Sequence, residues 1–227
     1  MFTALELTLT GIYLVNFMAY MFTTSLGESK VRGANKILLA GSYLLIGVLL
    51  FIQNRHFDSI DILLLLAIGF TFIGDVLLLF VFNIGALFFT FGNLCLFAHD
   101  ILLLEITLDL HYSQYWWFIL VYVALLGGYM ILESFNTHFR IPKKDRLKAF
   151  GYLALVSLHG SLGICMYFIT DYKPALLLGI GSLMFTLSDY VLCSYKYSIN
   201  HEISVHKLNT FLYFGGIILI TWSFCVF

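Results

Sequence analysis

Eight long apolar runs, separated by short polar or charged connections, dominate the pattern of hydrophobic and polar positions along the chain. They cover roughly residues 5–24, 37–53, 60–80, 86–108, 116–134, 149–170, 174–195 and 207–227. Each run is long enough for a helix to cross about 30 Å of hydrocarbon, because a helix rises about 1.5 Å per residue. The runs are continuous and do not alternate with period two, which favours helices over a β-barrel. The pattern predicts an all-α polytopic membrane protein with eight transmembrane helices.

Composition supports this class. Of the 227 residues, 61% are hydrophobic and only 11% are charged, whereas a soluble domain carries about a quarter charged residues. The length fits a single membrane domain over residues 1–227. The net charge of −1 and the absence of a long basic run argue against a nucleic-acid partner.

The basic residues predict an orientation. Ten of the twelve fall in connections on one side of the eight spans, for example Lys30, Arg32 and Lys36 between the first two. Only Arg55 and Lys173 fall on the other side. The positive-inside rule places the basic side in the cytoplasm and both termini outside. Together with the Lys-over-Arg and Phe/Ile-rich usage, this predicts an integral multi-pass protein of a bacterial plasma membrane.

The second half of the chain echoes the first. The segment GFTFIGDVLLL around Asp75 resembles LMFTLSDYVLC around Asp189, 114 residues later. Lys36 and Lys148, which precede the second and sixth spans, are 112 residues apart. The agreement suggests two repeats, 1–112 and 113–227, with four spans each. An even number of spans gives both halves the same orientation, so the repeat is parallel.

Asp75 and Asp189 are the candidate catalytic residues. Each lies roughly 7–9 Å inside the cytoplasmic boundary of its span, at about 1.5 Å per residue. A charge at that depth costs at least a few kcal/mol if it faces lipid, and a packing role needs no carboxylate. We therefore expect both to face a polar interior and to meet in one cavity open to the cytoplasmic leaflet.

Five further residues are predicted to bind a substrate in that cavity. Gly92, Asn93 and His99 lie in the fourth span and Tyr213 in the eighth. Lys36 lies at the cytoplasmic mouth, where it suits an anionic head group. The plainer interpretation stays open: small and polar residues inside membranes usually serve helix packing, and Lys36 is equally explained by the positive-inside rule.

Other polar residues have plain explanations. Asp100 and Glu105 approach the outer end of the fourth span, where contact with water is expected. His159 is expected to be a hydrogen-bonded packing histidine. The four cysteines lie in apolar runs without metal-like spacing, and no HxxxH pair occurs, so neither a metal nor another cofactor is predicted.

Five motifs together resemble the YhhN-type lysoplasmalogenase-like family of eight-span membrane proteins. They are Asn35-Lys36, GFTFIGDVLLL, FGNLCLFAHD, GSLMFTLSDYVL and LYFGG. The resemblance covers nearly the whole chain. It implies hydrolysis of the vinyl ether bond of lysoplasmalogens, with a lysophospholipid substrate drawn from the membrane and no cofactor. The products would be a fatty aldehyde and a glycerophospho-alcohol.

The residues fit that chemistry independently. Hydrolysis of a vinyl ether needs a proton delivered to carbon, which gives an oxocarbenium-like state; water then adds and the hemiacetal collapses. Two carboxylates close together in a low-dielectric interior favour sharing one proton, so that one acts as acid and the other stays ionised. The sequence leaves open which aspartate is the acid.

Three positions depart from the family pattern. Ile37, Leu102 and Ile217 stand where family members commonly carry proline, tyrosine, and glutamine or histidine. These departures keep open a catalytically inactive, lipid-binding relative. A proton-coupled carrier of small molecules or lipids also fits paired membrane acids and a parallel repeat, although Pro142 and Pro174 lie at loop edges and break no span. A zinc-dependent lipid hydrolase is the remaining alternative.

The topology yields a direct test. Reporter fusions at Phe227 and within residues 142–148 should lie on opposite sides of the membrane, because an odd number of predicted spans separates the two positions. Activity of alkaline phosphatase and fluorescence of a cytoplasmic reporter measure the two sides. A readout of both positions on one side contradicts the number of spans and the orientation.

Overall fold

The eight predicted spans are present as eight long helices. The computed structural model describes residues 4–25, 30–54, 58–107, 115–136, 139–169, 173–199 and 202–226. In these ranges the helices are α1 (Ala4–Thr24), α2 (Lys30–Asn54), α3 (Ser59–Leu78), α4 (Phe82–Thr107), α5 (Tyr115–Phe135), α6 (Lys143–Ile169), α7 (Lys173–Lys196) and α8 (Ile203–Trp222), followed by the 3₁₀ turn η2 (Ser223–Val226). All eight are long and apolar enough to cross a membrane. The predicted all-α, eight-span fold is confirmed.

Several helices begin before the apolar runs that predicted them. The helix α2 begins at Lys30 instead of residue 37, and α6 begins at Lys143 instead of residue 149. Hydropathy reports which residues suit hydrocarbon, whereas a helix continues into the head-group region as long as its backbone bonds are satisfied. The basic residues at these helix starts therefore extend beyond the apolar core of the bundle.

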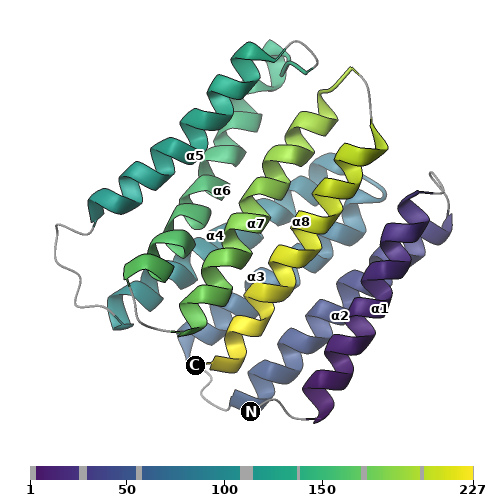
Figure 1. Ribbon diagram of the computed structural model, residues 1–227, viewed down its shortest axis with the longest axis vertical. Coiled ribbons are helices and arrows are strands. Elements are labelled where there is room, and N and C mark those ends of the chain that lie inside the picture. Colours follow the sequence, from purple (N-terminus) through teal and green to yellow (C-terminus); the bar gives the residue numbers. More distant parts are fainter. Residues whose placement is uncertain are drawn as a thin grey trace.

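The helices run side by side with a common tilt (Figure 1). The most extensive contacts join α3 to α4 and α7 to α8; α4 also packs on α6, and α8 on α2 and α3. The start of α1 and the end of α8 lie at one end of the bundle (Figure 1), and the helix starts and ends that carry Lys36, Lys148, Lys196 and Lys207 lie at the other. This other end is called the basic end below. Arg55 lies outside the described residues.

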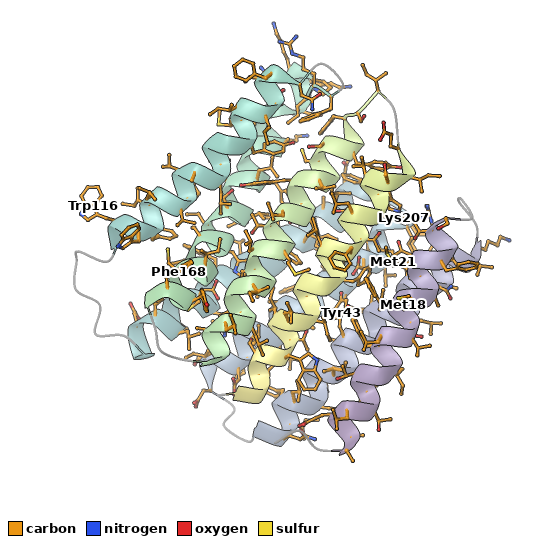
Figure 2. The ribbon with its side chains drawn as sticks, in the orientation of Figure 1. Met18, Met21, Tyr43, Trp116, Phe168 and Lys207 are labelled. Atoms are coloured by element: carbon orange, nitrogen blue, oxygen red, sulfur yellow. The ribbon has the colours of Figure 1, made fainter. Side chains whose placement is uncertain are left out.

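Large apolar side chains cover the outside of the bundle. Val15 on α1, Trp116 on α5 and Phe168 on α6 are each at least two-thirds exposed, and Figure 2 shows Trp116 projecting from the start of α5. Such a surface needs lipid around it instead of water. The inside holds a main apolar cluster across α1–α4 and α6–α8, and a smaller one between α5, α6 and α7.

Two glycines let α7 and α8 touch through their backbones. A Cβ atom placed on Gly216 would lie 2.7 Å from the backbone nitrogen of Phe185, and one on Gly181 would lie 2.9 Å from the carbonyl oxygen of Gly216. Small residues at helix contacts are the usual means of close packing in membranes. This contact brings α8, and with it Tyr213, up to α7.

Gly216→Ala should destabilise the bundle, because its added methyl group meets backbone that has no freedom to move away. We expect a loss of about 1–3 kcal/mol, measured as a lower thermal midpoint in detergent. The control is Gly128→Ala on α5, where no atom lies within 4 Å of the added Cβ; it should be neutral or stabilising. Equal midpoints for the two variants would contradict the close contact.

Candidate functional site

Asp75 is the centre of a buried polar cluster between α2, α3 and α8. The ammonium Nζ of Lys36 lies 3.0 Å from Asp75 Oδ1. The hydroxyls of Tyr43 and Tyr213 both donate to Oδ2, at 3.0 and 2.6 Å. The Asp75 side chain is 2% exposed and that of Lys36 is 15% exposed. One cation and two hydroxyl donors thus stabilise a carboxylate that its own helix cannot neutralise.

Helix geometry explains how α2 supplies two of these partners. Lys36 and Tyr43 are seven residues apart, which is about two turns and places them on one face. Tyr43 was missed by the sequence analysis, although its spacing from Lys36 is the signal that points to it. The predicted residues Lys36 and Tyr213 both contact Asp75, so the structure brings three of the seven predicted site residues together.

Asp189 on α7 has a different environment. Its Oδ2 accepts one hydrogen bond, from the Tyr152 hydroxyl at 2.8 Å, and the residue is buried. Among the residues that the structure describes, no lysine, arginine or histidine pairs with it. Asn93 neighbours the Tyr152 hydroxyl, while its amide nitrogen donates to the carbonyl of Phe89 at 3.0 Å. Asp189 is therefore buried with a hydroxyl donor but without a cation.

A cavity of about 640 Å³ lies between α4, α6 and α7 at the basic end. Asp189 and Tyr152 line it, together with the basic side chains Lys148 and Lys196. Leucines and alanines supply much of the remaining wall. The wall thus combines apolar side chains with polar and charged ones, as small-molecule sites do.

The expectation that both catalytic candidates line one cavity is correct for Asp189 only, since Asp75 is not among the lining residues. Phe89 lines the cavity and packs edge-on against the Tyr213 ring at 5.8 Å between centroids. Phe89 thus joins the cavity wall to Tyr213, whose hydroxyl contacts Asp75. The two aspartates are still close enough to interact electrostatically.

The other predicted substrate-binding residues lie away from the cavity wall. A Cβ on Gly92 would lie 2.9 Å from Thr71 Oγ1 and 3.3 Å from the carbonyl oxygen of Ala67, so Gly92 lets α3 and α4 pack closely. Asn93 reaches the cavity only through its neighbour Tyr152. Neither Gly92, Asn93 nor His99 lines the cavity.

A second buried polar cluster joins α4 to α6. Asp100 Oδ1 lies 3.0 Å from His99 Nδ1, and Asp100 Oδ2 lies 2.7 Å from His159 Nδ1. All three side chains are fully buried. The expectation that Asp100 contacts water is wrong, because its side chain is fully buried and pairs with His159 of α6. No cluster suited to a metal ion occurs in the described part of the chain.

The Asp75 cluster predicts a non-additive effect on stability. Lys36→Met leaves a buried carboxylate without its cation and should destabilise the protein by up to about 3–5 kcal/mol. Adding Asp75→Asn removes the charge and should recover most of that loss. Thermal unfolding of the two single variants and the double variant measures the coupling, with Lys143→Met at the exposed start of α6 as control. Additive effects would show that the ion pair contributes nothing.

Comparison with known proteins identifies a family. A family model described as the YhhN family matches residues 34–224, from α2 into η2, and the matched segment includes Lys36, Asp75, Asp189 and Tyr213. No curated protein and no solved structure matches the chain. Since the family model covers far more than half of the sequence, the chain belongs to the YhhN family.

Proposed function

We propose that the protein is a membrane lipid hydrolase that cleaves the vinyl ether bond of lysoplasmalogens. The observation that carries the proposal is the contrast between its two aspartates. Asp75 is paired with a cation and does not line the cavity, whereas Asp189 lines the cavity and pairs with no cation of the described residues. Membership of the YhhN family and a cavity at the basic end whose wall combines apolar and basic side chains support a lipid as substrate.

Asp189 acts as the acid in this proposal. Burial disfavours a carboxylate that has no cation beside it, and two like charges close together in a low dielectric are unfavourable. The pair therefore carries one proton. Lys36 and the two tyrosine donors favour the charge on Asp75, which leaves the proton on Asp189, at the cavity wall.

The reaction then needs four proton movements. Asp189 donates its proton to the β-carbon of the vinyl ether, and the α-carbon becomes an oxocarbenium centre next to the new carboxylate. Water adds to that α-carbon while Asp189 accepts a proton from the water, which gives a hemiacetal. Asp189 then donates that proton to the ether oxygen as the carbon–oxygen bond breaks, and it accepts the proton of the hemiacetal hydroxyl, so that aldehyde and glycerophospho-alcohol are released and the acid is regenerated.

Tyr152 and Asp75 are positioning residues in this scheme. The Tyr152 hydroxyl donates a hydrogen bond to Oδ2 of Asp189. This bond orients the carboxyl group and leaves its other oxygen for the substrate. Asp75 supplies a fixed negative charge that favours the protonated acid and, after proton transfer, the cationic intermediate.

A proton-coupled carrier is the second candidate, and one observation favours it. His99, Asp100 and His159 form a fully buried titratable cluster within the bundle, a feature of proton pathways in transporters. Proton flux into vesicles coupled to lipid or solute movement would support the carrier. Aldehyde release without flux would support the hydrolase.

The defining assay is aldehyde release by the purified protein from a lysoplasmalogen and from its ester-linked analogue. Only the vinyl ether should be cleaved. Asp189→Asn should lower the rate about 10²–10⁴-fold, the usual contribution of an acid–base group. It should keep or raise the thermal midpoint, because the desolvation cost of a buried carboxyl group is reduced.

The control for this variant is Glu202→Gln, which removes an exposed acid before α8 and should leave the rate unchanged. Asp75→Asn should also lose activity. His99→Ala should retain more activity than either, because His99 does not line the cavity. Near-normal aldehyde production by Asp189→Asn, in a folded protein, would falsify the mechanism.

A further inference from the structure

The mouth of the cavity holds an ammonium group that the chain itself supplies. Lys196 Nζ lies 3.5 Å from the centroid of the Phe82 ring and 5.3 Å from that of Tyr197. Both distances are within the roughly 6 Å at which an aromatic face attracts a cation. Asp145 lies close enough to act electrostatically on Lys196 and Tyr197. All four side chains line the cavity.

The proposed hydrolysis gives no role to this cluster of two aromatic rings and one carboxylate. An aromatic face next to an acid is the arrangement with which proteins bind alkylammonium ligands. We propose that Phe82, Tyr197 and Asp145 form a binding site for the ammonium of a phospho-ammonium lipid head group. In the bound state Lys196 leaves the ring and, with Lys148, faces the phosphate.

The identity of the ligand as a lysolipid rests on the proposed function, and the dimensions agree with it. Lys196 and Asp189 are seven residues apart on α7, which is about 10 Å along the helix. In a lysoplasmalogen with an ethanolamine or choline head group, ten bonds separate the vinyl carbon from the nitrogen. At about 1.2 Å per bond they span roughly 12 Å when extended. A lipid with its vinyl ether at Asp189 thus places its ammonium at Phe82.

The exchange also balances charge. The ligand ammonium replaces the lysine ammonium beside Asp145, and the freed Lys196 meets the phosphate that arrives with it. Lys148 is exposed at the same opening and supplies the second cation. A head group that carries only a phosphate contacts the lysines but leaves the aromatic site empty. The site therefore distinguishes zwitterionic from purely anionic lipids.

Binding of 1-alkyl lysophospholipids tests this without catalysis, because a saturated ether has no vinyl carbon to protonate. Four head groups are compared by calorimetric titration in detergent: phosphocholine, phosphoethanolamine, phosphoglycerol and phosphate. The wild type should bind the two amines about threefold or more tightly than phosphoglycerol. Equal affinity for all four overturns the proposal.

Phe82→Leu should abolish this preference and leave the affinity for phosphoglycerol unchanged. Its control is Phe168→Leu, since Phe168 is 77% exposed on α6 and lies away from the mouth (Figure 2); this variant should keep the preference. A preference that survives Phe82→Leu overturns the proposal.

Lys196→Met should change the head-group preference in the opposite direction to Phe82→Leu. Removing the competing lysine should raise the ratio of phosphocholine to phosphate affinity. If Lys196 binds phosphate only, the variant should weaken the binding of every ligand equally, and that result overturns the proposed exchange.

Soluble glycerophosphocholine should compete for the site much more weakly than the lysolipid does. Equal competition by the two overturns the assignment of the ligand as a lipid. If the head-group preference is found but no vinyl ether is cleaved, the proposed hydrolysis fails and the head-group site stands.

Discussion

Compensation of buried carboxylates is the constraint on which the rest of this structure depends. An acid inside a low-dielectric bundle costs several kcal/mol unless cations or donors reach it. Asp75 pairs with Lys36 of α2 and accepts a hydrogen bond from the Tyr213 hydroxyl of α8. Asp100 on α4 receives His159 from α6, and Glu133 on α5 receives Arg146 from α6. Each partner comes from another helix, so satisfying these charges fixes which helices are neighbours and how they are rotated.

The same constraint separates Asp189 from Asp75, Asp100 and Glu133. It has a hydroxyl donor but no cation in the described part of the chain, and it lines a cavity. An incompletely compensated acid lowers stability, and natural proteins retain such a cost chiefly at sites of function. This energetic exception therefore distinguishes Asp189 as the candidate acid more sharply than the presence of two aspartates does.

The fold was predictable because membrane helices satisfy their backbone within a single segment, so that one apolar run suffices to indicate one helix. The inward direction of Asp75 followed from the cost of charge in lipid. The pairing of Lys36 with Asp75 did not, because the sequence assigned Lys36 to an anionic head group or to the positive-inside rule. The pairing of Asp100 with His159 was not predictable, because 59 residues separate them and contact depends on the rotation of two helices. Tyr43 escaped notice because, inside an apolar run, only its spacing of seven residues from Lys36 points to it.

The two halves of the chain treat their buried aspartates differently. Lys36 and Asp75 of the first half correspond by spacing to Lys148 and Asp189 of the second. In the first half the lysine pairs with its aspartate at 3.0 Å. In the second half Lys148 lies at the cavity mouth, and no ion pair joins it to Asp189 within the described residues. If the halves arose from one repeat, the proposed mechanism gives the two copies different tasks: the first half supplies a fixed charge at Asp75, and the second half supplies a transferable proton at Asp189. Two identical copies would place either two ion pairs or two uncompensated acids in the membrane, so that the proposed acid and a stable bundle together require an unequal pair.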